Sequence, residues 1–517
     1  MRIAIVTFAL PAALALSAPG CGCRSAADPQ DAGPEDVEAF LRTQWVRDCG
    51  DWEYREAVPM DPPGEETPLA VKWQYPPPDD PAGATGPLAE RLDGGICLRR
   101  GSMAGELLCL DRAGDLLRRW DPGDGPIIGG PTVLPDGTVL AIWLVENMYL
   151  WNPENPDTIG HAAHGLGRMP DYLVGNYHGP LAAAGGRFFL ASLGARMTGP
   201  DDWYRLPIDL VLKQGGYLDR EWTWVALEPC FPQWTGGVMG DEAIFSRPCN
   251  RRSPPPPRDV VGVRIDGSLE VLLPDAPPEY QRVYVLGDGK LAYSIQLGYS
   301  DRTGFDDNSV EPVQWCRVDR STLAPDCVVL EDTIPPIDFI VAADGTPIGV
   351  RNATYHRDAI GVGRPTFIAA WEPDGRVRWR LDFSDVICYG SGSPCLSVPV
   401  VGADGSTLFF QQAGWLEAGT WMHRAILHRI SRDGSVHDTL AVDGFWPRAG
   451  REHSPILARD GTLYHIVTVV ESQVGEGSTA RHECVVAFQT PVPGLAPEDP
   501  GWPVYDRRTT RGDLWAR

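Results

Sequence analysis

Two histidines three residues apart, His161 and His164, form the tightest pair of metal-ligating side chains in the sequence. On a helix, histidines at this spacing could bind zinc from one face. No glutamate lies between them, and the segment is predicted to be a surface loop. His423 and His428 flank a predicted strand at an odd spacing, which places them on opposite faces. We predict no metal site at either pair.

Other short motifs that could carry chemistry are incomplete. The Asp-Asp-Asn run at 306–308 could bind calcium weakly, but it lacks the EF-hand register and is expected to be a solvated loop. The Gly-x-Gly motifs at 165–167 and 361–363 lack the third glycine of a dinucleotide site. The segment Gly390–Pro394 has Gly392 where a nucleophile elbow needs serine. We therefore predict no catalytic residue and no cofactor.

The first twenty residues have the features of a secretion signal. Arg2 precedes an apolar run of about 17 residues, too short and too interrupted by Pro11 to favour a membrane span. Small residues then lead to Cys21. This ending resembles the lipobox of bacterial lipoproteins, which implies that Cys21 is diacylated, and Gly22 after it implies the outer membrane. The alternative is a plain signal peptide, with Cys21 and Cys23 paired or free.

Twelve cysteines in an exported chain predict disulfides. Cys316 and Cys327 lie almost symmetrically about Ser321-Thr322, and Cys97 and Cys109 about Ser102-Met103, so each pair should face across a hairpin. Two further close couples are Cys230 with Cys249 and Cys388 with Cys395, and the remaining Cys49 and Cys484 are predicted to bond to each other.

Charge and composition divide the chain into unequal parts. The net charge of −24 disfavours a nucleic-acid partner or an anionic lipid surface, because like charges repel. Residues 21–66 are rich in Asp, Glu, Pro and Ala and predict a tether. Within it, apolar residues at helical spacing between Glu35 and Cys49 predict one short helix. Contact with the membrane is expected through the N-terminal lipid only.

From residue 67 onward, short β-rich runs alternate with turn residues. Asp-Gly between apolar runs predicts a hairpin with a type I′ turn, in which both central residues have positive φ. Eight such markers or degenerate copies recur every ~43–60 residues, a period typical of propeller blades. They are Asp93-Gly94, Asp136-Gly137, Gly185-Gly186, Gly240-Asp241, Asp288-Gly289, Asp344-Gly345, Asp404-Gly405 and Asp460-Gly461.

A second series of turn markers falls between the first, at Asp111, Asp266, Asp319, Asp374 and Asp433. Two hairpins per repeat give four strands, which is one blade. The sequence therefore predicts an all-β propeller of about eight four-stranded antiparallel blades over residues 67–517.

The last repeat lacks an outer strand, because Pro491, Pro493 and Pro497 interrupt its end. Residues 69–75 have the missing pattern, with Trp73 where complete repeats carry Trp120 and Trp379. We predict that this N-terminal segment pairs in the blade that contains Cys484, so that the two ends close the propeller.

The repeats resemble the pyrroloquinoline-quinone-type propeller repeat, whose blades have Asp-Gly hairpins and an outer Gly-x-x-x-Trp strand. Residues 374–379 match best, 113–120 carry two extra residues, and the tail 501–509 is similar to a segment that flanks such propellers. Cofactor-dependent members carry adjacent cysteines beside the quinone, and no Cys-Cys dipeptide occurs here. The resemblance therefore implies a relationship to the non-enzymatic members, which include outer-membrane assembly lipoproteins.

Two classes of function follow from this sequence. We favour a binding or scaffold propeller that holds a protein or glycan partner at the cell envelope. The alternative is an enzyme on the same scaffold, either a quinoprotein-type dehydrogenase or a polysaccharide-acting hydrolase or lyase.

The anchoring prediction can be tested by labelling with a fatty-acid analogue. The full chain should take up the label and Cys21→Ala should lose it, because the acyl chains attach at that residue. Labelling that survives the substitution would contradict lipidation at Cys21.

Overall fold

The computed structural model describes residues between Pro63 and Gly494, all of which belong to one compact unit. Residues 1–62 lie outside the described part, and so do Cys21, Cys49 and the predicted signal, tether and helix. The other residues outside it are 65, 77–83, 92, 101–105, 122–126, 134–137, 144–147, 152–159, 162–172, 178–180, 183–186, 196–206, 215–216, 226–232, 240–241, 248–257, 277–279, 287–289, 297–298, 301–303, 306–311, 334–336, 343, 352–365, 384–395, 418–419, 448–454, 459, 471–480 and 495–517.

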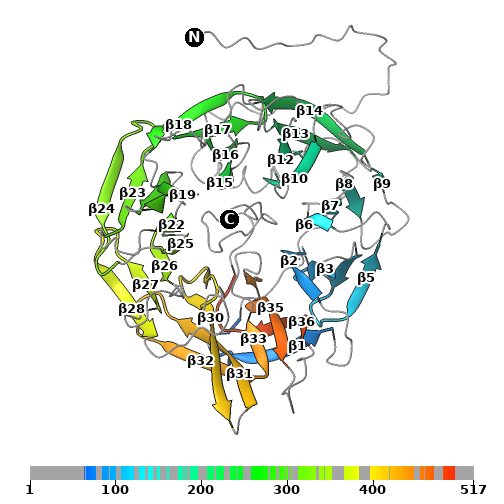
Figure 1. Ribbon diagram of the computed structural model, residues 1–517, viewed down its shortest axis with the longest axis vertical. Coiled ribbons are helices and arrows are strands. Elements are labelled where there is room, and N and C mark those ends of the chain that lie inside the picture. Colours follow the sequence, from blue (N-terminus) through cyan, green and yellow to red (C-terminus); the bar gives the residue numbers. More distant parts are fainter. Residues whose placement is uncertain are drawn as a thin grey trace. The chain divides into compact units, whose positions relative to one another are not determined.

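The described residues form eight antiparallel sheets of four or five strands, here numbered 1 to 8, and one two-stranded ribbon. Figure 1 shows the sheets following one another in sequence order. Sheet 1 has β2 (Ala84–Glu90), β3 (Ile96–Arg100), β4 (Glu106–Leu110) and β5 (Leu116–Trp120). Sheet 2 has β6 (Ile127–Val133), β7 (Val139–Trp143), β8 (Met148–Trp151) and β9 (Gly160–His161). Sheet 3 has β10 (Leu173–Tyr177), β11 (Leu181–Ala182), β12 (Arg187–Ala195), β13 (Pro207–Gln214) and β14 (Tyr217–Val225). Sheet 4 has β15 (Gln233–Met239), β16 (Glu242–Arg247), β17 (Arg258–Arg264) and β18 (Leu269–Ala276).

The second half of the chain continues the same pattern. Sheet 5 has β19 (Tyr280–Val285), β20 (Leu291–Ile295), β23 (Gln314–Val318) and β24 (Pro325–Val329), and the ribbon β21 (Tyr299–Ser300) and β22 (Gly304–Phe305) lies between β20 and β23 in the sequence. Sheet 6 has β25 (Asp338–Val341), β26 (Pro347–Arg351), β27 (Thr366–Trp371) and β28 (Val377–Phe383). Sheet 7 has β29 (Val400–Val401), β30 (Thr407–Glu417), β31 (Thr420–Ile430) and β32 (His437–Asp443). Sheet 8 has β1 (Ala70–Tyr75), β36 (Arg481–Gln489), β35 (Thr462–Val470), β33 (Phe445–Pro447) and β34 (Ile456–Leu457). No helix able to span a bilayer occurs in the described part of the chain.

Each predicted turn marker lies between two paired strands, but the turn type differs from the expectation. In the turn from β2 to β3, the Gly94 N–H donates to Arg91 O (3.0 Å) and the Arg91 N–H to Gly95 O (2.8 Å). Gly94 has φ +81°. The turn at Asp404-Gly405 has the same two hydrogen bonds, from the Gly405 N–H to Gly402 O (3.0 Å) and from the Gly402 N–H to Ser406 O (2.9 Å), and there Gly405 has φ +80° while Ala403 and Asp404 have no positive φ. That turn is therefore a type I turn followed by a left-handed glycine in a bulge, and the predicted type I′ geometry is wrong for it. The aspartate fits because its carboxylate accepts the N–H two residues later, which for Asp93 is that of Gly95 at 3.1 Å.

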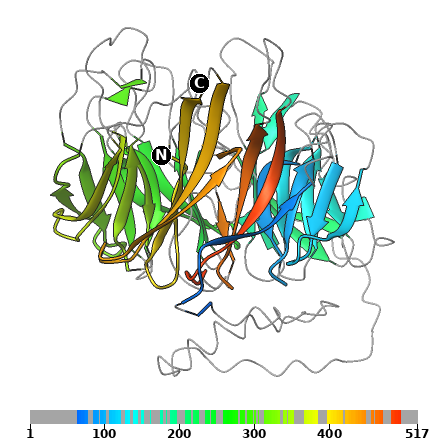
Figure 2. The same cartoon turned by 90° about the horizontal axis from the view of Figure 1, so that it is seen from below.

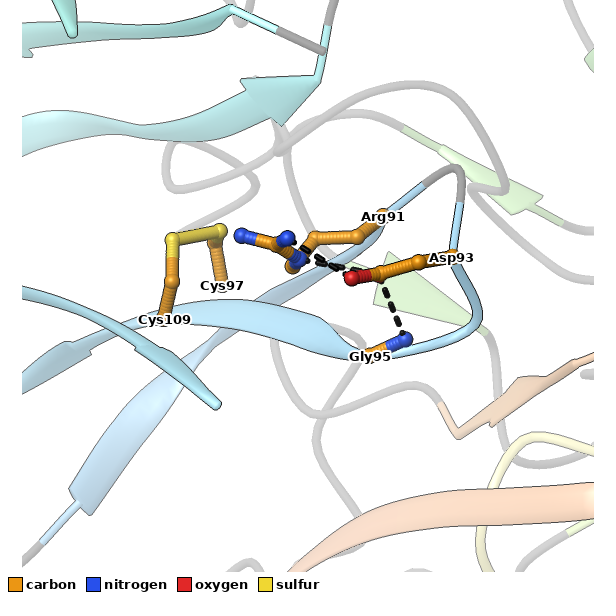
Figure 3. The surroundings of a disulfide bond; sticks show 5 residues. All are labelled: Arg91, Asp93, Gly95, Cys97 and Cys109. Atoms are coloured by element: carbon orange, nitrogen blue, oxygen red, sulfur yellow. Dashed lines mark hydrogen bonds and ion pairs between the residues drawn. A yellow bond between two sulfur atoms is a disulfide. The ribbon is translucent and has the colours of Figure 1, made fainter. Parts of the chain in front are cut away.

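Two of the predicted disulfides are present in the described sheets. Cys97 on β3 is directly opposite Cys109 on β4, with their Cα atoms 4.1 Å apart, and Cys316 is opposite Cys327 at 4.0 Å. Figure 3 shows the first bond beside the turn, where Arg91 donates two hydrogen bonds to Asp93 at 2.9 and 2.7 Å. The couples Cys230/Cys249 and Cys388/Cys395 lie outside the described residues.

Cys484 is a free thiol in the structure, and its predicted partner Cys49 lies outside the described residues, so a bond between the two stays a prediction. Its side chain is fully buried on β36 in an apolar cluster with Val467 and Phe488. This burial raises the pKa of the thiol to about 12, so it stays protonated and unreactive at neutral pH.

The N-terminal strand β1 is the outer strand of sheet 8 and pairs antiparallel with β36 (Figure 2). Trp73 on β1 contacts the next sheet, since its Nε1 donates to Arg112 O at 2.9 Å in the turn from β4 to β5. Trp379 on β28 lies in the same relation to Gly434 in the turn from β31 to β32 of the following sheet. Trp73 therefore has the role in sheet 8 that Trp379 has in sheet 6, as the sequence pattern indicated.

The cores lie between consecutive sheets. Buried clusters join sheets 1 and 2, 4 and 5, 5 and 6, 6 and 7, and 7 and 8. A further cluster joins sheet 8 to sheet 1, with Tyr464 and Val485 packed against Leu108. Tyr464 also donates to Gly94 O at 2.6 Å across this boundary. Each fully buried large apolar side chain contributes about 1.5–3 kcal/mol, so these boundaries hold neighbouring sheets together.

Removal of β1 tests its role in the fold. A chain that begins at Pro76 should lose cooperative thermal unfolding followed by circular dichroism, because the β36 edge and the cluster around Tyr464 become exposed. A control chain that begins at Asp61 keeps β1 and should melt like the full protein. Identical melting of the two truncated chains would show that β1 is dispensable.

Candidate functional site

A recurring ion pair links the outer turn of one sheet to the preceding sheet. In sheet 7, Arg432 in the turn from β31 to β32 contacts Asp344 of sheet 6, with Nη2 and Oδ2 2.5 Å apart. In sheet 1, Arg112 contacts Asp460 of sheet 8, also at 2.5 Å. In sheet 5, the Nη2 atom of Arg320 lies 2.7 Å from the Oε2 atom of Glu242 in sheet 4. In all three sheets, an arginine at the same position of the outer turn forms an ion pair with an acid of the preceding sheet.

Burial and charge oppose each other at these acids. Burial alone would raise the pKa of Asp460, but hydrogen bonds from Arg112 and Thr462 outweigh it and hold that pKa below its usual range. At Glu242, burial exceeds the effect of Arg320, and the pKa is raised. The pKa of Asp344 is lowered, like that of Asp460, because hydrogen bonds from Thr346 and the charge of Arg432 more than offset the effect of burial.

A polar groove of about 720 Å³ surrounds the Arg432 turn, formed by turns and strands of sheets 6 and 7. It is lined by charged residues and serines: Glu372, Arg378, Asp404, Ser406, Arg429, Ser431, Arg432 and Asp433. We identify this polar groove as the candidate functional site, because it concentrates fixed charges from two sheets in one place.

Internal contacts fix the orientation of the groove side chains. Arg378 forms a two-point contact with Glu372, with its Nε and Nη2 atoms 2.8 and 2.9 Å from the carboxylate oxygens. Arg429 on β31 donates to Asp438 on β32 at 3.0 Å. On the other side of the groove, Ser406 donates through its backbone N–H and its hydroxyl to Asp404, at 2.9 and 2.8 Å.

The electrostatics of the groove favour binding over proton transfer. The Arg378 hydrogen bond lowers the pKa of Glu372, and hydrogen bonds from Ser431 and Ser435 lower the pKa of Asp433. Both carboxylates are therefore ionised at neutral pH, whereas a general acid needs a pKa near the working pH. The groove presents fixed acceptors beside arginine donors, an arrangement suited to polar or charged partners.

Most of the residues that the sequence singled out for chemistry lie outside the described part of the chain. His161 ends sheet 2 on β9, while His164, residues 306–308 and the segment 390–394 lie outside the described part. His423 and His428 both lie on β31, five positions apart and hence on opposite faces.

Sequence reasoning did not find the groove, although a local signal existed. The outer turns of sheets 1, 5 and 7 carry arginine at one shared position, directly after Asp111, Asp319 and Ser431. A single aspartate, glutamate or serine in a turn indicates only the turn itself. An arginine that recurs at the same position of several turns indicates a contact to another sheet.

These observations define an all-β protein of four-stranded antiparallel sheets. No protein-family model matches the chain, and no curated protein matches it. Among solved structures, Chaetomium thermophilum Sqt1 is similar at 11% identity over 82% of this chain and 98% of that one, with a TM-score of 0.47. Sqt1 bound to the N-terminus of a ribosomal protein gives 11% identity over 80% and 98%, with a TM-score of 0.45. TolB from Acinetobacter baumannii gives 12% identity over 60% of this chain and 65% of that one, with a TM-score of 0.28.

The repeated ion pair predicts a difference between two matched variants. Asp460→Asn should destabilise the protein by about 1.5–3 kcal/mol, the value of a hydrogen bond to a charged group, because Asp460 is only 8% exposed. Asp344→Asn should cost less, since its side chain is 29% exposed and solvent screens its pairs. Urea unfolding at pH 7 measures both.

The cost of Asp460→Asn should also depend on pH. The folded pKa of Asp460 is lowered, so its contribution is complete above the unfolded value of 3.8 and disappears as pH falls through the folded pKa. The gap between the wild-type protein and Asp460→Asn should therefore narrow in acid. A gap that is constant from pH 7 to pH 2.5 would exclude this ionic contribution.

Proposed function

We propose that this protein is an exported, lipid-anchored β-propeller that binds a protein or glycan partner at the cell envelope. The single observation that carries the binding role is the polar groove between sheets 6 and 7, with its fixed arginines and ionised carboxylates. Export and anchoring rest on the signal-like N-terminus and on the small residues before Cys21.

The eight sheets are the proposed blades. Four features support this assignment: four-stranded antiparallel sheets, hairpin connections, cores between consecutive sheets, and a last sheet that contains the N-terminal strand. Pairing of β1 with β36 would close the propeller and remove a sheet edge that could otherwise aggregate. The scaffold would then hold the turns that form the groove in a rigid arrangement.

The chemistry of the groove defines the partner in general terms. Arg432 is 59% exposed and projects from a turn, so it can form hydrogen bonds with carboxylates or hydroxyls of a bound molecule. The neighbouring Asp433 is ionised and exposed, and accepts hydrogen bonds. Charged side chains of a protein segment and the hydroxyls of a glycan both match this set of donors and acceptors.

A matched pair of arginine variants tests the role of the groove. Arg432→Ala should reduce capture of the partner by the membrane-anchored protein at least about tenfold, equivalent to about 1.4 kcal/mol. The control is Arg376→Ala, since Arg376 is 70% exposed, forms an ion pair with Asp374 of its own turn, and does not line the groove. Cross-linking on intact cells followed by quantitative mass spectrometry measures capture.

Melting temperatures of both variants should remain close to that of the wild-type protein, which separates binding from folding. Equal capture by the wild-type protein and Arg432→Ala would remove the groove from the binding surface. Loss of the same partner in Arg376→Ala would place the contact elsewhere on sheet 6.

A further inference from the structure

Two imidazoles from neighbouring strands of sheet 7 point their nitrogens at each other. His428 on β31 and His437 on β32 have Nδ1 and Nε2, respectively, 2.9 Å apart. Their ring centroids are 5.2 Å apart and the ring planes differ by 19°. The centroid distance is close to the nitrogen–nitrogen distance plus two ring radii, so the nitrogens lie almost on the line that joins the rings. The two imidazoles are therefore arranged end to end.

Gln411 on β30 determines the tautomer of His428. The Nε2 atom of His428 lies 2.9 Å from the Oε1 atom of Gln411. An amide oxygen only accepts hydrogen bonds, so Nε2 carries the proton and Nδ1 keeps a lone pair. That lone pair is directed at His437. The Gln411 contact has the form of the outer hydrogen bond that orients a metal-binding histidine.

Aromatic packing prevents rotation of the His428 ring. The ring stacks on Phe409 with centroids 4.7 Å apart and meets the edge of Phe383 at 5.6 Å. His428 is 5% exposed, whereas His437 is exposed. Burial, and then the neighbouring His437, lower the pKa of His428 to about 3, so the ring is neutral at physiological pH. One ligand is thus fixed and neutral, and the other can adjust its position.

We propose that His428 Nδ1 and His437 Nε2 together bind one divalent transition-metal ion at the outer edge of sheet 7. The ion replaces the proton that the two nitrogens share. Metal–nitrogen distances of about 2.0–2.1 Å require the His437 ring to shift and tilt, because the two nitrogens face each other at only 2.9 Å. The exposed His437 side chain permits this movement. Water completes the coordination on the solvent side.

Imidazole ligands and solvent exposure narrow the identity of the ion. Nitrogen ligands suit copper, nickel and zinc, while calcium and magnesium prefer oxygen. No group of three histidine, cysteine, aspartate or glutamate side chains that could hold a metal occurs among the residues described. The site therefore provides two protein ligands, and Cu²⁺, which binds nitrogen sites most strongly in its series, is the appropriate probe.

The test uses the full chain without a polyhistidine tag, in a His161→Ala/His164→Ala background that removes the other close histidine pair. Equilibrium dialysis with Cu²⁺ should show one site that His437→Gln weakens at least tenfold. Glutamine can still donate a hydrogen bond to Nδ1 of His428, so the local packing is preserved while the second imidazole is lost. The paramagnetic resonance spectrum of bound Cu²⁺ should show two equivalent nitrogen couplings, and one in His437→Gln.

Two control variants separate this site from adventitious binding. Thr439→Ala changes the exposed residue directly opposite His428, and His482→Ala removes a histidine from sheet 8; both should bind Cu²⁺ like the parent protein. Equal binding by His437→Gln and the parent would overturn the proposal. So would a bound-copper spectrum that does not change in His437→Gln, because the ion would then have other ligands.

Discussion

The absence of a Cβ atom at one position in the outer turns of sheets 1, 6 and 7 is the constraint on which the packing of these sheets depends. A Cβ at Gly114 would lie 2.5 Å from Cδ2 of Trp73, and a Cβ at Gly434 would lie 2.6 Å from Cβ of Trp379. Gly375 meets the backbone of Val329 in the same way. In each case the turn of one sheet rests on the outermost strand of the sheet before it. The glycine thus satisfies a positive φ and also allows close approach between sheets.

The polar contacts between sheets follow from this close approach. Once the turn lies against the preceding sheet, an arginine at its second position can reach an acid there, as Arg112 and Arg432 do. The acid itself belongs to another Asp-Gly turn. Its second carboxylate oxygen accepts the backbone N–H two residues later, which is that of Thr346 for Asp344 and that of Thr462 for Asp460. Apolar cores at the same boundaries supply most of the stabilisation, and the ion pairs add orientation. The polar groove is one such boundary with additional arginines and serines.

Local features were predictable from the sequence, and features formed between distant segments were not. The hairpins, and the pairs Cys97–Cys109 and Cys316–Cys327, depend on residues about ten apart, where spacing about a turn determines the register. The position of Trp73, which matches Trp120 and Trp379 in complete repeats, was enough to predict where β1 pairs. The burial of Cys484 was not predicted, because it depends on the direction in which its side chain points from β36. The groove brings together Asp344 and Arg432, 88 residues apart, and the sequence associated His428 with His423 instead of its cross-strand neighbour His437.

The pairing of β1 with β36 has a consequence for how the protein folds while it is being synthesised. The hydrogen bond from Lys72 to Thr462 joins residues 390 positions apart, so sheet 8 is held together by contacts between segments far apart in the sequence. Such contacts form slowly, because the chain must close a long loop before they contribute. Synthesis delivers β1 early and β35 and β36 late. Until those last strands emerge, the edge of β1 is unpaired and Trp73 lacks the sheet against which it packs, so the nascent chain is prone to aggregation at this stage.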